Sequence, residues 1–130
     1  MQIALIAHDD KKELLTQFCI AYCGILSKHR LCATATTARV IGEATGLEIK
    51  PLLSGLQGGG EQIASRIAYG EVDVLFYFRS TATSAEYGEG DDLIRQCDAN
   101  NVPLATNLAT AEAVILALDR GDLDWRENMR

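Results

Sequence analysis

The residues best suited to chemistry form a glycine-rich turn between a strand-like segment and a helix-like one. The turn reads Leu53-Ser54-Gly55-Leu56-Gln57-Gly58-Gly59-Gly60-Glu61-Gln62. Glycine accepts positive φ and lets backbone N–H groups converge, while a helix that starts after the turn adds partial positive charge. These properties suit an oxyanion such as phosphate. Glu61, the first carboxylate after the turn, is a candidate general base, although a charge favourable to the helix dipole explains it equally well.

The surrounding sequence alternates apolar strands with amphipathic helices. We expect strands over 3–7, 31–35, 49–53, 72–78 and 102–106, and helices over 10–26, 37–44, 62–68, 91–99 and 109–118. Continuous apolar strands between helices predict an α/β fold, with a five-stranded parallel sheet covered on both faces. The length of 130 residues is that of one domain, so we expect 1–130 to form a single unit.

Ligands of such sheets bind at the carboxyl ends of the strands, so the turns there supply the candidate site. Those turns contain His8, Asp9 and Lys12, then Thr34, Thr36 and Thr37, then Ser54 and Gly55, then Arg79, Ser80 and Thr81, and finally Thr106 and Asn107. Hydroxyls, a lysine and a glycine turn favour a small anionic ligand. Neither G-x-G-x-x-G nor G-x-x-x-x-G-K-[ST] occurs, so nothing supports a dinucleotide or nucleoside triphosphate.

Composition and charge narrow the expected partners. A net charge of −6 argues against duplex DNA or an anionic membrane surface. The N-terminus lacks the basic region of a signal peptide, and no apolar run approaches the ~20 residues of a membrane span. The four cysteines, Cys19, Cys23, Cys32 and Cys97, form no Cys-x-x-Cys pair, which favours buried free thiols in a reducing cytoplasm over a metal site or disulfides.

Several turns, taken in order, resemble the methylglyoxal synthase family along essentially the whole chain. The matching segments are Ile3-Ala4-Leu5-Ile6-Ala7-His8-Asp9 with Lys12, Ala33-Thr34-Ala35-Thr36-Thr37, Ala44-Thr45-Gly46-Leu47, Leu53-Ser54-Gly55, and Val102-Pro103-Leu104-Ala105-Thr106-Asn107. The resemblance implies a flavodoxin-like three-layer α/β/α sandwich, usually a homohexamer. It also implies elimination of phosphate from dihydroxyacetone phosphate to give methylglyoxal, without metal or cofactor.

The resemblance also implies roles for individual residues. Lys12, Thr34, Thr37, Ser54 and Gly55 would hold the substrate phosphate, and His8 and Asp9 would shape the first turn. Arg126 near the C-terminus would be a further cation. Simpler explanations exist as well: a solvated lysine, helix-capping threonines, and a core histidine bonded to backbone.

The acid–base positions depart from the family pattern. In the family the glycine turn runs Ser-Gly-Pro-x-Gly-Gly-Asp-Gln-Gln, and its Asp is the catalytic base. Gly60 stands at that position here, with Glu61 next. In the loop after the fourth strand, Glu86 or Tyr87 falls near a family His, and Glu89 near a second family Asp. These loop residues are more simply explained as solvated surface.

Two functional hypotheses follow from this pattern. In the first, the chain is a phosphate-eliminating lyase of the family, impaired or dependent on Glu61 as a shifted base, with Glu86 and Glu89 as further acid–base candidates. In the second, it is a non-catalytic or repurposed protein that binds a small phosphorylated or carboxylated ligand.

Overall fold

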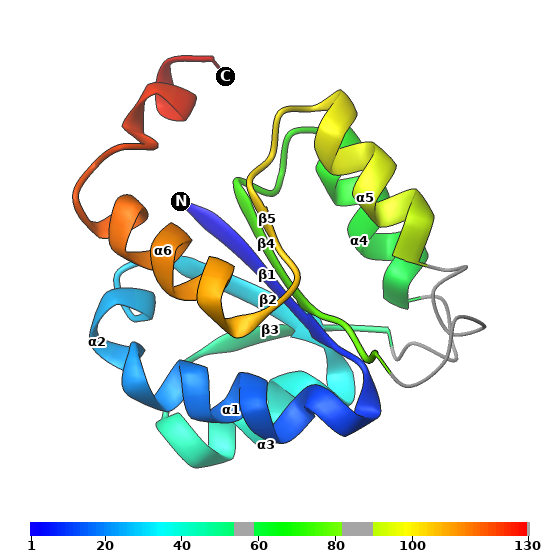
Figure 1. Ribbon diagram of the computed structural model, residues 1–130, viewed down its shortest axis with the longest axis vertical. Helices are drawn as coiled ribbons and strands as arrows, with labels where there is room; N and C mark the ends of the chain where they lie inside the picture. The colour runs from blue at the N-terminus through cyan, green and yellow to red at the C-terminus, as the bar shows by residue number, and fades with distance from the viewer. Residues whose placement is uncertain (54–58, 82–89, 130) are drawn as a thin grey trace.

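The fold is organised around one parallel sheet (Figure 1). The structure, a computed structural model, describes residues 1–53, 59–81 and 90–129. Its five strands run in the order β3-β2-β1-β4-β5. Their bounds are β1 Gln2–Ala7, β2 Arg30–Thr34, β3 Ile49–Leu52, β4 Val74–Phe78 and β5 Leu104–Ala105. The predicted α/β class with a five-stranded parallel sheet is confirmed.

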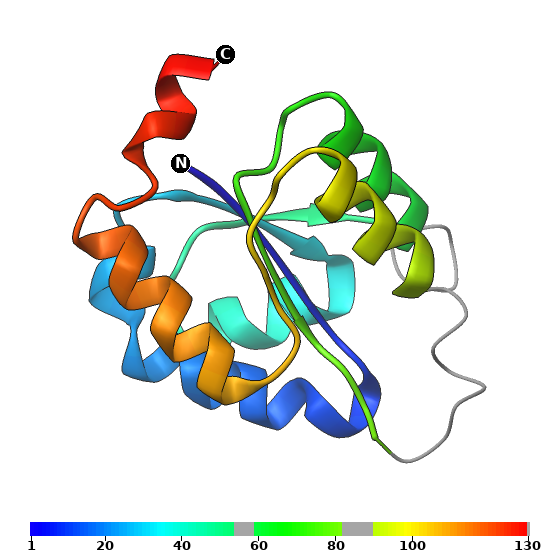
Figure 2. The ribbon, with the colours of Figure 1, turned by 45° about the horizontal axis from the view of Figure 1, so that its top comes forward.

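Helices cover both faces of the sheet, as Figures 1 and 2 show. On one face lie α1 (Lys12–Ala21), α2 (Cys23–Leu26), α3 (Ala35–Thr45) and α6 (Leu108–Asp119). On the other lie α4 (Gly59–Ala68) and α5 (Gly90–Ala99). Two 3-10 turns, η1 (Asp9–Lys11) and η4 (Asp124–Met129), complete the described elements.

The core divides into two clusters because successive side chains of a strand point to opposite faces. On the α1 side, Phe76 and Phe78 of β4 pack on Phe18. The ring centroid of Phe18 lies 5.1 Å from that of Phe76 and 5.8 Å from that of Phe78. On the α4 side, Leu75 of β4 and Ile63 of α4 belong to the second cluster. A central strand buried on both faces is continuously apolar, which explains why β4 could be predicted so clearly.

The structure corrects several predicted boundaries. The helix expected over 10–26 starts as η1 and is interrupted at Tyr22 (φ −109°, ψ 24°). The second strand ends at Thr34 because Ala35 already begins α3. β5 is shorter than expected, and Pro103 just before it has no N–H to donate, although its carbonyl accepts from the Leu75 N–H at 3.0 Å. The four cysteines are free, as predicted, and Cys19, Cys32 and Cys97 are buried, but Cys23 is only partly buried.

Candidate functional site

The strands that follow β1 are added first on one side of it, as β2 and β3, and then on the other, as β4 and β5. At this switch point, hydrogen bonds join the turn after β1 to the turn after β4. The backbone N–H of Ser80 donates to Nδ1 of His8 at 2.8 Å, and Nε2 of His8 lies 3.0 Å from the Tyr77 hydroxyl. Since Nδ1 accepts, the ring hydrogen is on Nε2, which donates to Tyr77. His8 is therefore held in one orientation at the point where ligands of open α/β sheets bind. The alternative of a histidine satisfied by protein partners describes these contacts equally well.

Ser80 makes a second link between the two turns. Its hydroxyl donates to the Asp10 carboxylate at 2.7 Å, and Ser80 itself is only 1% exposed. Neither Asp10 nor Tyr77 stands out in the sequence. Tyr77 lies within an apolar strand, and Asp10 has the character of an ordinary first-turn acid, so only the long-range bonds reveal their place in the network.

Asp9 and Lys12 form an exposed pair in the same turn. Their side chains are 2.8 Å apart, and that of Asp9 is 98% exposed. The hydrogen bond and charge of Lys12 lower the pKa of Asp9. An exposed pair of this kind contributes little to stability, so Lys12 can exchange Asp9 for a ligand anion at small cost.

The threonines lie where β2 runs into α3. Thr34 and Thr37 are buried, and the Thr34 hydroxyl donates to that of Thr37 at 3.3 Å, while Thr36 is exposed. Thr34 occupies the N-cap position of α3 but its side chain makes no capping bond, and the first turn carries no acidic residue. The first-turn N–H groups of α3 are thus not capped by Thr34, an arrangement that suits a bound anion.

Only the beginning and the end of the glycine turn lie among the residues that the structure describes. Ser54 and Gly55 lie outside the described residues, as do Glu86 and Glu89 with Tyr87. Gly60 and Glu61 stand in the first turn of α4, where Glu61 is exposed. A Cβ at Gly60 would meet no heavy atom of residues 1–53, 59–81 or 90–129 within 4 Å, so these residues leave room for a side chain there.

The structure places Arg126 away from these residues. Its Nε lies 3.3 Å from Oδ1 of Asp73, a carboxylate 1% exposed, just before β4 begins. The other oxygen of Asp73 accepts from the Gln2 backbone N–H at 2.8 Å, at the start of β1. Arg126 therefore binds at the amino end of the strands, so within one chain it does not join the carboxyl-end residues. This pairing offers a structural role in place of the expected phosphate contact.

A cavity of about 400 Å³ lies at the carboxyl ends of β4 and β5. Residues from three of the turns contribute polar side chains to its lining: Lys11, Arg79, Ser80, Thr81, Thr106 and Asn107. Asn107 caps α6 through a bond from the Thr110 N–H at 3.1 Å. All of these residues except Lys11 belong to the edge that the sequence predicts, so the cavity borders the β4 and β5 part of that edge. His8, Lys12, Thr34 and Thr37 are not among its lining residues.

Residues 1–53, 59–81 and 90–129 offer no evident metal site. No group of three His, Cys, Asp or Glu residues in these ranges is placed to hold a metal ion. None of the helices in this part of the chain has the length and apolar character needed to cross a bilayer.

Comparison with known proteins agrees with the fold and with the family resemblance. The MGS-like domain model matches residues 18–106. A methylglyoxal synthase of Caldicellulosiruptor saccharolyticus is 57% identical over 98% of this chain and 91% of its own. One from Oceanobacillus iheyensis is 51% identical over the same shares. The crystal structure of methylglyoxal synthase from Elizabethkingia anophelis superimposes with a TM-score of 0.78 at 35% identity, covering 88% of this chain and 76% of that one.

Sequence identity over nearly the full length and a shared fold lead to the same assignment: this chain belongs to the methylglyoxal synthase family.

Proposed function

We propose that this protein is a methylglyoxal synthase that eliminates phosphate from dihydroxyacetone phosphate. Its identity to family members over almost the whole chain carries the proposal. The polar carboxyl edge of the sheet supports it, because that edge offers hydroxyls, a lysine and helix N–H groups to a small anion.

The proposed reaction needs a base and a held phosphate but no cofactor. The base removes a proton from the hydroxymethyl carbon next to the carbonyl, and an enediolate forms. Collapse of the enediolate breaks the C–O bond on the other side of the carbonyl and expels inorganic phosphate. The resulting enol takes up a proton on carbon to become methylglyoxal. A positioned base contributes about 10²- to 10⁴-fold, and donors aimed at the developing oxyanion contribute a similar factor.

Lys12, Thr34 and Thr37 are the proposed phosphate ligands among the described residues, with Ser54 and Gly55 joining them from the glycine turn. The Lys12 side chain is only 27% exposed, and its partner Asp9 is almost fully exposed. Both threonines are buried at the start of α3. Thr36 is assigned a peripheral contact because it is exposed, and His8 and Asp9 position the first turn.

Glu61 is the proposed base, in the absence of a carboxylate at position 60. Glutamate is one methylene longer than aspartate, which favours a shifted base. Adjacent helix residues, however, point about 100° apart, and a misplacement of about 1 Å can cost ~10²-fold. We therefore expect slow turnover, with Glu86 and Glu89 as the remaining acid–base candidates.

A second candidate function is binding without this chemistry. The observation in its favour is Gly60 itself, at the position of the family's base. A protein that retained the phosphate ligands but not the base would bind a phosphorylated or carboxylated metabolite. It would then serve as a sensor or regulator, or as an enzyme for another substrate.

Incubation with dihydroxyacetone phosphate, with methylglyoxal and inorganic phosphate followed separately, distinguishes these functions. The lyase forms both products in equal amounts, and Glu61→Gln abolishes their formation while Glu43→Gln, a matched change on an exposed part of α3, does not. Absence of both products with the wild-type protein would exclude the lyase and leave the binding function.

The remaining features of the proposal follow from family resemblance. The whole chain would act as one domain, assembled as a homo-oligomer, specifically a hexamer, and it would work in the cytoplasm on a metabolite rather than on nucleic acid or a membrane. Light scattering of the purified protein tests the hexamer.

A further inference from the structure

A second polar cavity lies away from the proposed active edge. Its volume is about 820 Å³, and it opens beside β2 and the edge strand β3. Three of its lining residues are cations from three different elements: Arg30 of β2, Lys50 of β3 and Arg66 of α4. Glu48 is the single carboxylate among the described residues that line it. Such an excess of positive charge is unexpected on a chain of net charge −6.

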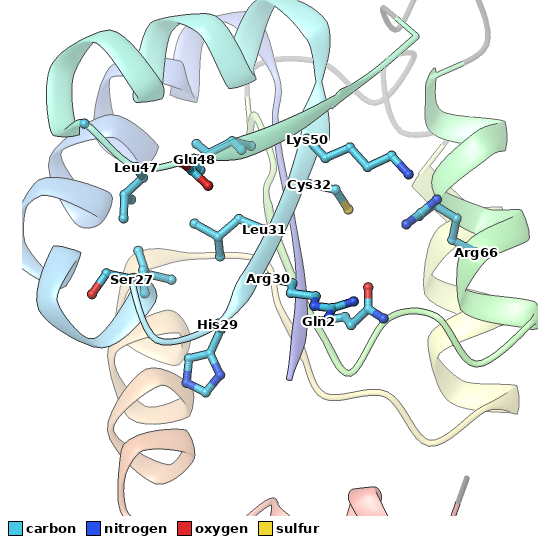
Figure 3. Close-up of a pocket in the computed structure, with 13 residues that line it drawn as sticks. Gln2, Ser27, His29, Arg30, Leu31, Cys32, Leu47, Glu48, Lys50 and Arg66 are labelled. Atoms are coloured by element: carbon cyan, nitrogen blue, oxygen red, sulfur yellow. The ribbon is translucent and has the colours of Figure 1, made fainter.

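Strand register brings these side chains to one face. Gln2 pairs with Arg30, and Cys32 pairs with Lys50, so each pair points to the same side of the sheet. That side is the α4 side, because Cys32 packs in the cluster formed with Ile63 and Ile67. Figure 3 shows the ends of Lys50 and Arg66 turned toward the same space beside Cys32. We call the group Gln2, Arg30, Cys32, Lys50 and Arg66 the α4-side cluster.

Arg66 is only partly satisfied by the described residues around it, which include the Cys32 thiol and the Glu71 carboxylate. Its Nε is buried and has no hydrogen-bond partner within the described part of the chain. Its Nη1 lies 3.6 Å from the Glu71 carboxylate, which is too long for a strong bond. A guanidinium presents a rigid fork of donors that matches oxyanions, and a buried donor without a partner is costly.

The Cys32 thiol lies within the field of these cations. Burial raises the pKa of Cys32, while Arg66 and the charge of Lys50 act against that rise. Cys32 is only 7% exposed, so this positive field extends to the floor of the cavity.

We propose that the α4-side cluster is a second anion site, which binds a phosphate dianion either free or as part of a small phosphate monoester. Arg66 supplies the donor fork, Lys50 and Arg30 supply further charge, and Gln2 supplies an amide. The site is distinct from the proposed active edge, since Gln2 and Arg30 are the first residues of their strands whereas His8 and Thr34 lie at the carboxyl ends.

Titration calorimetry with inorganic phosphate tests the site in a Lys12→Gln background, which weakens binding at the active edge. We expect phosphate to bind this protein, and Arg66→Gln or Lys50→Gln to weaken that binding by roughly tenfold to a hundredfold. Arg66→Lys, which keeps the charge, should lose less. Arg95→Gln is the matched control, because it removes one charge from a side chain on α5 that is 75% exposed, and it should leave the affinity unchanged.

A repeat with glycerol 3-phosphate separates the two sources of the anion. Tighter binding than inorganic phosphate assigns the cavity to a monoester, and equal or weaker binding assigns it to free phosphate. The proposal is overturned if the Lys12→Gln protein binds neither ligand, or if Lys50→Gln and Arg66→Gln, with unaltered thermal unfolding, bind phosphate as their parent does. No step of this test depends on turnover. A failure of the second anion site can therefore be distinguished from a failure of the lyase assignment.

Discussion

The side-chain Oε1 of Gln62 accepts a hydrogen bond from the Leu53 backbone N–H at 2.9 Å. This bond joins the first turn of α4 to the residue that follows β3, and so fixes the two ends of the glycine turn relative to each other. Any ligand held by the backbone of that turn depends on this spacing. We therefore expect Gln62 to act as a positioning residue.

Replacement of Gln62 by leucine should therefore loosen the grip on the substrate phosphate. Because Gln62→Glu keeps an acceptor oxygen and Gln62→Leu does not, we expect KM for dihydroxyacetone phosphate to rise about tenfold in the leucine variant and less in the glutamate variant. Steady-state kinetics measures both. Equal effects of the two substitutions on KM would show that the bond to Leu53 does not determine the geometry of the glycine turn.

Gly60→Asp should increase methylglyoxal formation. A Cβ at this position would have no heavy atom of the described residues within 4 Å, and an acid in the first turn of a helix is favoured by the helix dipole. We expect kcat to rise by at least about tenfold, with KM changed little, because a base acts in the transition state. Gly24→Asp, a matched change at another open glycine, should have no such effect.

If Gly60→Asp folds normally but gains no activity, the deficit lies elsewhere. The segment 82–89, which contains Glu86 and Glu89, would then be the next to alter.

Arg126→Met should reduce stability far more than substrate binding. It leaves the Asp73 carboxylate, 1% exposed, without the guanidinium 3.3 Å away, which we expect to lower the free energy of unfolding by about 2–4 kcal/mol. Urea unfolding measures the loss, and the double variant with Asp73→Asn should lose less than the sum of the single changes. A tenfold rise in KM with unchanged stability would instead restore Arg126 as a phosphate ligand.

We expect the free energy of unfolding to fall in alkaline solution, because the buried thiols ionise more readily in the unfolded chain than in the folded one. Burial raises the pKa of Cys19 from 9.0 to about 12, and that of Cys97 likewise to about 12. Because the unfolded thiols ionise first, their contribution to stability is complete below pH 9 and is lost progressively as the pH rises toward 12. Urea midpoints measured under reducing conditions at a series of pH values on either side of 9.0 check this.

The Cys19→Ala variant isolates the thiol contribution from that of lysines and tyrosines. It should be less stable at neutral pH, since Cys19 is fully buried, yet lose stability less steeply in alkaline solution. Parallel curves for the two proteins would contradict the prediction.

The sequence predicted the sheet well because its strands are short apolar runs between helical patterns. β4, buried at every position, is unmistakable, and the turns after β1 and β2 could be assigned to one edge from topology alone. Local pattern could not predict the break at Tyr22, where the hydroxyl donates to Glu112, 90 residues away, at 2.9 Å.

The same limit applies to the C-terminus and to the α4-side cluster. Family resemblance assigns Arg126 to the phosphate, whereas its partner in the structure is Asp73, 53 residues earlier. Arg30, Lys50 and Arg66 are separated by other elements and look like ordinary surface cations in the sequence. Only strand register and the packing of α4 bring them together.

The central place of β1 in the sheet has a consequence for synthesis on the ribosome. β1 pairs with β2 on one side and with β4 on the other, and its Ile3 is matched with Val74. The nascent chain can assemble β1, β2 and β3 early, but the second edge of β1 stays unpaired until β4 emerges. An apolar strand edge is a template for intermolecular pairing. We therefore expect the growing polypeptide to be most prone to aggregate, and most in need of a chaperone, between the emergence of Leu52 and that of Phe78 from the ribosome.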